Sequence, residues 1–171
     1  MIKLIDILKE TYLGGGEQGK IYALDKNKIK KQSNFSDGFT QNELYFYNQF
    51  NKHPNIFPKI HELTKSYVIM DRLYDIPDLG NVLDYLEQIN MWRDKDPMTM
   101  IYYLLRNNDS SKINTLLNKT KNNKSVYNSL LKYIKFTQDV LNVFPNKSID
   151  FHTGNIGVDN NGDLKIFDLA L

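Results

Sequence analysis

The stretch YLGGGEQGKIY, residues 12–22, restricts the folds open to this chain more than any other part of the sequence. Three of its glycines satisfy the pattern G-x-G-x-x-G, in which glycine lets backbone N–H groups approach a phosphate: Gly14, Gly16 and Gly19. Taken alone, this pattern is equally consistent with a flexible turn. The residues after the last glycine separate the architectures that use it.

A stable helix cannot begin at the last glycine. The residues KIYAL are followed at once by the turn residues DKNK at 25–28, which leaves too few positions for a helix. This argues against the dinucleotide-binding βαβ unit and the P-loop, because both hold phosphate at a helix N-terminus. Ile21 also stands where the P-loop needs a hydroxyl for magnesium. We therefore expect a β-hairpin that covers phosphates with its backbone.

The composition is that of an ordinary folded protein. Of the 171 residues, 41% are hydrophobic and 12% aromatic, which excludes wholesale disorder. A formal net charge of +2, from 22 basic and 20 acidic residues, is too small to indicate nucleic acid as the main partner. The chain has no cysteine, which suits a reducing cytoplasm, and no apolar run long enough to cross a membrane. We expect a cytoplasmic protein without a membrane or nucleic-acid partner.

The expected elements divide the chain near Leu73. Residues 1–73 show the pattern of short strands around one helix, TQNELYFYNQF, for which Ser36 or Asp37 could be the N-cap. Residues 74–171 show the pattern of helices, followed by a hairpin of the strands NIGV and LKIF. The fold class predicted from this order is α+β.

Two segments of the helical half stand out. Residues 126–144 carry a broad apolar stripe at helical spacing and form the clearest helix in the sequence. The polar segment at 107–125 is expected to be a solvated helix-and-loop insertion, not a linker between independent domains.

Three polar residues near the C-terminus have the spacing of a phosphoryl-transfer site. Asn155 follows Asp150 by five positions, and Asp168 comes after a predicted hairpin, at the end of a strand. Hard oxygen ligands from Asn and Asp suit magnesium, which neutralises phosphate oxygens. A further carboxylate can hydrogen bond to the acceptor hydroxyl. We therefore expect Asn155 and Asp168 to bind Mg²⁺ and Asp150 to act on the acceptor.

These motifs resemble the protein-kinase-like superfamily. The segments IDFHTGNIGV and LKIFDLA are closer to the D-x-H-x-x-N form of aminoglycoside phosphotransferases and atypical kinases than to the H-R-D-L form of ordinary protein kinases. The resemblance covers nearly the whole chain in the right order. It implies a two-lobed fold, with residues 1–73 as a small β-rich N-lobe and residues 74–171 as a truncated, mostly helical C-lobe. It also implies ATP and Mg²⁺ as cofactors, and a structural hydrogen bond from His152.

The resemblance also assigns roles to residues of the N-terminal half. Lys31 would bind the ATP phosphates as a second catalytic residue, and it is preferred over Lys30 because Ile29 and Lys31 share one strand face. Glu43, in QNELYFYNQF, would pair with Lys31. The other residues implied to contact the nucleotide are Gly14, Gly15, Gly16, Gly19, Ile21, Ile29, Met70 as the gatekeeper, and the backbone of Asp71 to Leu73.

The sequence departs from the family pattern after the last motif. Ala170 stands where D-F-G has glycine, and only three residues follow Asp168, without an activation segment or an A-P-E motif. The polar insertion at about 94–124 or a homodimer could substitute for those parts by covering the catalytic face.

Three functions remain consistent with these observations. The leading hypothesis is a small ATP- and Mg²⁺-dependent phosphotransferase that acts on protein Ser/Thr hydroxyls. A small-molecule hydroxyl is the close alternative, because of the D-x-H-x-x-N pattern. A pseudokinase that only docks a partner is the third. The retained Asp150, Asn155 and Asp168 favour an enzyme, whereas the missing substrate platform favours a binding module.

Overall fold

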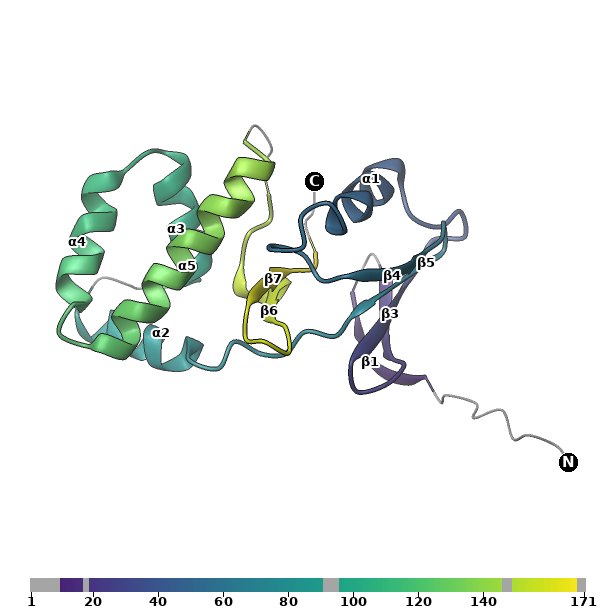
Figure 1. Cartoon of the computed structure of the whole chain (residues 1–171), viewed down its shortest axis with the longest axis horizontal. Coiled ribbons are helices and arrows are strands. Elements are labelled where there is room, and N and C mark those ends of the chain that lie inside the picture. Colours follow the sequence, from purple (N-terminus) through teal and green to yellow (C-terminus); the bar gives the residue numbers. More distant parts are fainter. Residues whose placement is uncertain (1–9, 17–18, 91–95, 146–148, 169–171) are drawn as a thin grey trace, which may run out of the picture. The chain divides into compact units, whose positions relative to one another are not determined.

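The structure, a computed structural model, describes residues 10–16, 19–90, 96–145 and 149–168 (Figure 1). The chain forms two compact units, Met1–Leu73 and Tyr74–Leu171. Strands dominate the first and helices the second, so the fold class is α+β, as predicted. The departure at Ala170 lies outside the described residues, and so do parts of the 94–124 insertion.

The described part of the N-terminal unit is built on a five-stranded antiparallel sheet. Its strands are β1 (Thr11–Gly15), β2 (Gly19–Ala23), β3 (Lys28–Ser33), β4 (Ile60–Leu63) and β5 (Tyr67–Asp71). The order across the sheet is β1-β2-β3-β5-β4, so β3 is the central strand (Figure 1). The turn before β3 forms because the Asp25 carboxylate accepts the N–H groups of Asn27 and Lys28, at 2.6 and 2.8 Å. Strands β1 and β2 pair antiparallel, so the hairpin predicted on the glycine stretch is confirmed.

One helix, α1 (Gln41–Phe50), connects β3 to β4. Its N-cap is Thr40, so the prediction of Ser36 or Asp37 was wrong. Gly38 has a φ of +79°, which is incompatible with a right-handed helix, so α1 can begin only after it. Thr40 opens a T-x-x-E capping box, which satisfies N–H groups at the start of the helix.

Aromatic rings fix α1 in the core of the N-terminal unit. Phe50 is completely buried and stacks on Phe57, with ring centroids 4.5 Å apart. Phe46 meets both rings edge-on, at 4.8 and 5.5 Å. Tyr47 lies against Phe39 at 5.1 Å. Such ring pairs stabilise a fold beyond the area that they bury, by about 0.5–1.5 kcal/mol each.

In the described part of the C-terminal unit, four α-helices precede a short 3-10 helix and a β-hairpin (Figure 1). They are α2 (Leu79–Gln88), α3 (Pro97–Arg106), α4 (Ser110–Thr120), α5 (Lys124–Val143), η1 (Thr153–Asn155), β6 (Ile156–Val158) and β7 (Leu164–Ile166). The apolar stripe predicted for α5 is confirmed, because its buried residues are Val126, Leu130, Tyr133, Ile134, Phe136, Thr137 and Val140.

The polar segment contributes to the core more than its sequence suggests. It forms α4, which packs on α3 and α5 and buries Leu116 and Thr120. Thr120 lies in the core at low cost because its hydroxyl donates to the Leu116 carbonyl oxygen, at 3.0 Å. None of the helices in the described residues is both long and apolar enough to cross a membrane.

A buried tyrosine on α5 makes the free energy of unfolding depend on pH in the alkaline range. The Tyr133 hydroxyl is buried and finds no hydrogen-bond partner among the described residues. Burial, with a smaller contribution from the charge of Asp78, raises the pKa of Tyr133 from 10.0 to about 12. The folded state then binds the proton more tightly than the unfolded state. The free energy of unfolding therefore falls as the pH rises from the unfolded pKa to the folded one.

Replacing Tyr133 with Phe removes both effects. We expect the free energy of unfolding to rise by about 1 kcal/mol at pH 7, because an unsatisfied buried hydroxyl is lost. We also expect a weaker decline of stability above pH 10. Urea unfolding of wild type, Tyr133→Phe and the control Tyr103→Phe, whose ring is exposed, at pH 7, 9 and 11 measures this. Loss of stability at pH 7 in Tyr133→Phe would contradict it.

Candidate active site

Asp150 lies between two buried residues, and its own side chain is exposed. Phe151 is 2% exposed and stacks on Tyr102 at 5.3 Å, and Ile149 is 6% exposed. The Ile149 N–H also donates to the Tyr102 hydroxyl oxygen, at 3.4 Å. The Asp150 side chain is 55% exposed. The Asp150 carboxylate is therefore accessible from solvent although its neighbours belong to the core.

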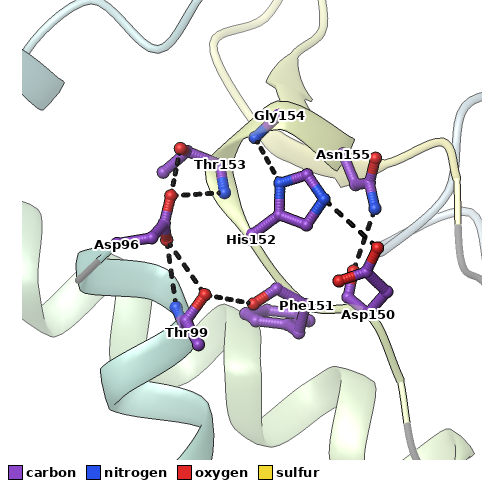
Figure 2. A network of polar contacts seen from close by, with 8 residues as sticks. All are labelled: Asp96, Thr99, Asp150, Phe151, His152, Thr153, Gly154 and Asn155. Carbon is purple, nitrogen blue, oxygen red and sulfur yellow. Dashed lines mark hydrogen bonds and ion pairs between the residues drawn. The ribbon is translucent and has the colours of Figure 1, made fainter. Parts of the chain in front are cut away.

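His152 connects the Asp150 carboxylate to the loop backbone (Figure 2). Its Nδ1 accepts the Gly154 N–H at 3.0 Å, and its Nε2 lies 3.3 Å from Oδ2 of Asp150. In neutral imidazole, a ring nitrogen that accepts leaves the proton on the other nitrogen. Nε2–H then donates to Asp150. This is the loop-shaping hydrogen bond that the resemblance implies for His152.

The β-hairpin brings the segment that ends at Asp168 beside Asn155. Ile156 pairs with Ile166 across the hairpin, and the Phe167 N–H donates to the Asn155 carbonyl oxygen at 3.0 Å. The Asn155 side-chain Nδ2 donates to the Asp150 carbonyl oxygen at 2.9 Å (Figure 2). Asp150, Asn155 and Asp168 are thus gathered on one loop and one hairpin of the C-terminal unit.

The donor set of this cluster suits magnesium. Because Nδ2 of Asn155 is used within the loop, its Oδ1 is the atom left for a cation. Among the described residues, no three His, Cys, Asp or Glu side chains gather in a way that could hold a metal. Mg²⁺ commonly takes one or two protein oxygens and completes its shell with phosphate and water. Oδ1 of Asn155 and the carboxylate of Asp168 would supply two such protein oxygens.

In the N-terminal unit, strand register gathers four of the predicted nucleotide contacts. Ile21 pairs with Lys31 between β2 and β3, and Ile29 pairs with Met70 between β3 and β5. Directly paired residues share a face, and so do positions two apart on one strand. These four side chains therefore lie on one face of the sheet. Lys30 is on the opposite face, where its Nζ pairs with Glu10 at 2.9 Å.

Lys31 is buried, whereas Glu43 is occupied elsewhere. The Lys31 side chain is only 4% exposed, and its Nζ lies 5.9 Å from the centroid of the Tyr47 ring. Oε2 of Glu43 accepts the Thr40 N–H and hydroxyl, at 2.8 and 2.9 Å. Oε1 of Glu43 is buried and finds no hydrogen-bond partner in the described part of the chain. The expected Lys31–Glu43 ion pair is absent here, but this unsatisfied oxygen is available to a cation.

The glycines of the hairpin fall into two groups. A Cβ at Gly15 would lie 2.9 Å from the Gly19 carbonyl oxygen, and one at Gly19 would lie 2.7 Å from that of Gln32. These two glycines are required by the close approach of β1, β2 and β3. A Cβ at Gly14 or Gly16 would meet nothing within 4 Å. These two residues have open space at the Cβ position, and the Gly16 N–H donates to the Gly19 carbonyl oxygen at 3.0 Å.

The segment Asp71 to Leu73, predicted to contact the nucleotide, has one backbone N–H group that makes no hydrogen bond within the described residues. The Asp71 N–H donates to the Lys59 carbonyl oxygen at 3.0 Å, and the Arg72 N–H donates to that of Asn27 at 2.7 Å. No hydrogen bond within the described residues uses the Leu73 N–H. The Asp71 carboxylate is itself held by His61 Nε2, at 2.6 Å.

Sequence reasoning missed Asp96, which holds the loop that carries Asp150. Asp96 lies at the start of α3 and accepts hydrogen bonds from Thr153 (Figure 2). An Asp followed by Pro is a common helix start, so the sequence contained a signal for the cap. It contained none for the distant loop.

Comparisons with known proteins find weak likenesses among solved structures alone. No protein-family model matches the sequence, and no curated protein matches it. Among solved structures, the chain is similar to one of a streptomycin–ATP–APH(2'')-IIa ternary complex, with 14% sequence identity and a TM-score of 0.40. The match covers 96% of this chain and spans 66% of the other.

Proposed function

We propose that this protein transfers a phosphoryl group from ATP to a hydroxyl, with Mg²⁺ bound. The observation that carries this proposal is the gathering of Asp150, Asn155 and Asp168 on one loop and hairpin. An exposed carboxylate on the same loop and hairpin as two hard oxygen ligands suits this reaction, in which metal and acceptor must be held close together.

In the C-terminal unit, we assign magnesium to Oδ1 of Asn155 and the carboxylate of Asp168. When bound there, Mg²⁺ would neutralise charge on the phosphate oxygens. Asp150 orients the acceptor hydroxyl and takes up its proton as that oxygen bonds to the γ-phosphorus. The bond from the γ-phosphorus to the bridging oxygen breaks, and ADP leaves with the electron pair. His152 keeps the Asp150 carboxylate in place.

In the N-terminal unit, we assign the phosphates to Lys31 and to the open glycines of the hairpin. Lys31 is the buried lysine of the sheet face that also carries Ile21, Ile29 and Met70. These apolar side chains suit the adenine ring, and the Leu73 N–H suits one of its nitrogen acceptors.

For the acceptor, a protein Ser/Thr hydroxyl is the first candidate and a small-molecule hydroxyl the second. His152 favours the second, because it holds Asp150 through an imidazole, as the D-x-H-x-x-N pattern implies. Both classes use the same carboxylate, so only the acceptor needs to be varied in an experiment.

Incubation with γ-labelled ATP and Mg²⁺ tests the proposal. We expect label to appear on the protein, on an added peptide library or on a panel of hydroxylated small molecules. Lys31→Ala should slow transfer by about 100-fold, because a buried cation that holds the phosphates is lost. The control Lys30→Ala changes the partly buried neighbour on the opposite face and should leave the rate unchanged. A wild type that binds a partner but transfers no label to any acceptor would overturn the proposal and indicate a binding module.

A further inference from the structure

A single carboxylate joins the start of α3 to the loop that carries Asp150 (Figure 2). Oδ1 of Asp96 accepts the N–H groups of Met98 and Thr99, at 2.9 and 3.0 Å, and so caps the helix. Oδ2 of Asp96 accepts the Thr153 N–H at 2.8 Å, and the Thr153 hydroxyl as well. The two partners are 57 residues apart in the chain.

Thr99 adds a second connection from α3 to the same loop. Its hydroxyl donates to the Phe151 carbonyl oxygen at 2.8 Å (Figure 2). Phe151 and Thr153 are the neighbours of His152, so the loop backbone is fastened on both sides of that residue. Because the Asp150 side chain is half exposed, its direction depends on this backbone more than on packing.

We propose that Asp96 is a positioning residue for the reaction, because it holds the loop in the conformation that aims Asp150 at the acceptor. This inference rests on the function proposed above. The carboxylate suits the task because it only accepts hydrogen bonds, and each oxygen has two lone pairs. One oxygen serves the helix and the other serves the loop. Asp96 acts through the loop and touches no reacting atom.

The variant Asp96→Asn separates the two tasks. Asn caps a helix as well as Asp does, so α3 should keep its N-terminus. The amide NH₂, however, would face the Thr153 N–H, and two donors cannot bond to each other. The matched control is Asp109→Asn at the N-cap of α4. Asp109 accepts the Lys112 N–H at 3.2 Å and pairs with the same lysine, all within one helical turn.

Two measurements on the full chain decide the inference. Hydrogen exchange followed by mass spectrometry should show faster exchange in a peptide covering residues 149–156 for Asp96→Asn, and no change for Asp109→Asn. With ATP and Mg²⁺, kcat of Asp96→Asn should fall about 10- to 100-fold, as expected for a catalytic group displaced by about 1 Å. KM for ATP should stay within about twofold, because the loop is not assigned to the nucleotide.

A second pair of variants guards against simple unfolding. Thr99→Val removes the hydroxyl bonded to Phe151 and should lower kcat in the same direction, whereas Thr99→Ser keeps a hydroxyl and should restore it. Unchanged hydrogen exchange in residues 149–156 of Asp96→Asn would show that Asp96 does not hold the loop. Faster exchange with an unchanged kcat would overturn the positioning role. If the wild type transfers no label, the proposed function and the catalytic role fail, and hydrogen exchange still decides whether Asp96 anchors the loop.

Discussion

Replacing Asp150 with Asn should lower kcat for phosphoryl transfer by about 10²- to 10⁴-fold, the contribution usual for a general base. The amide has nearly the same shape and can still accept from Nε2–H of His152, which lies 3.3 Å from Oδ2 of Asp150. It cannot take up a proton from the acceptor hydroxyl. Single-turnover kinetics with γ-labelled ATP measure the loss.

The binding of ATP provides the check on this prediction. Asp150 is not assigned to the nucleotide, so the affinity for ATP with Mg²⁺, measured by calorimetry, should be the same in wild type and variant. Asp163→Asn serves as the control, because it makes the same chemical change at an exposed turn residue. A variant that keeps more than half of the wild-type rate would remove Asp150 from the mechanism.

Asp168→Asn should weaken magnesium binding about 10- to 100-fold, the range found when interactions at a metal site are lost. Asn keeps an oxygen ligand but loses the negative charge that favours a divalent cation. The transfer rate at saturating ATP should therefore need more Mg²⁺ for half of its maximum. Residual transfer at saturating Mg²⁺ should also be lower, because the site holds the metal less firmly.

A magnesium titration of the rate separates this effect from general damage. Asp163→Asn, on the turn of the same hairpin, should titrate like the wild type. Thermal unfolding without metal, measured for both variants, reports any change in stability separately from the loss of a metal ligand. An unchanged magnesium dependence in Asp168→Asn would show that this carboxylate does not hold the metal.

Local sequence patterns predicted the strands and the long helix, because these depend on periodicity. Glycines followed at once by strand formers and a turn gave the hairpin, and the apolar stripe gave α5. The alternation of β3 placed Lys31 and Lys30 on opposite faces. The N-cap of α1 was missed although Thr40 and Glu43 spell a capping box. The positive φ of Gly38, which delays the helix, is a property of the folded backbone.

The pairing expected for Lys31 shows where sequence reasoning stops. The resemblance implied a partner in Glu43, but one oxygen of Glu43 accepts hydrogen bonds from Thr40, and the other finds no hydrogen-bond partner among the residues that the structure describes. A glutamate at this helix position could either pair with Lys31 or accept hydrogen bonds from Thr40 in the capping box. Only the positions of neighbouring atoms decide which one a carboxylate adopts.

The sequence by itself determined which residues could carry the chemistry. The spacing of Asp150, Asn155 and Asp168 follows from a loop and a hairpin, which are formed by residues close together in the chain. Only the tertiary structure decided what holds that loop. Asp96 and Thr153 lie 57 residues apart, and nothing in either local pattern encodes their contact. The packing of α3 brings them together, because its apolar face is buried against segments that are distant in the sequence.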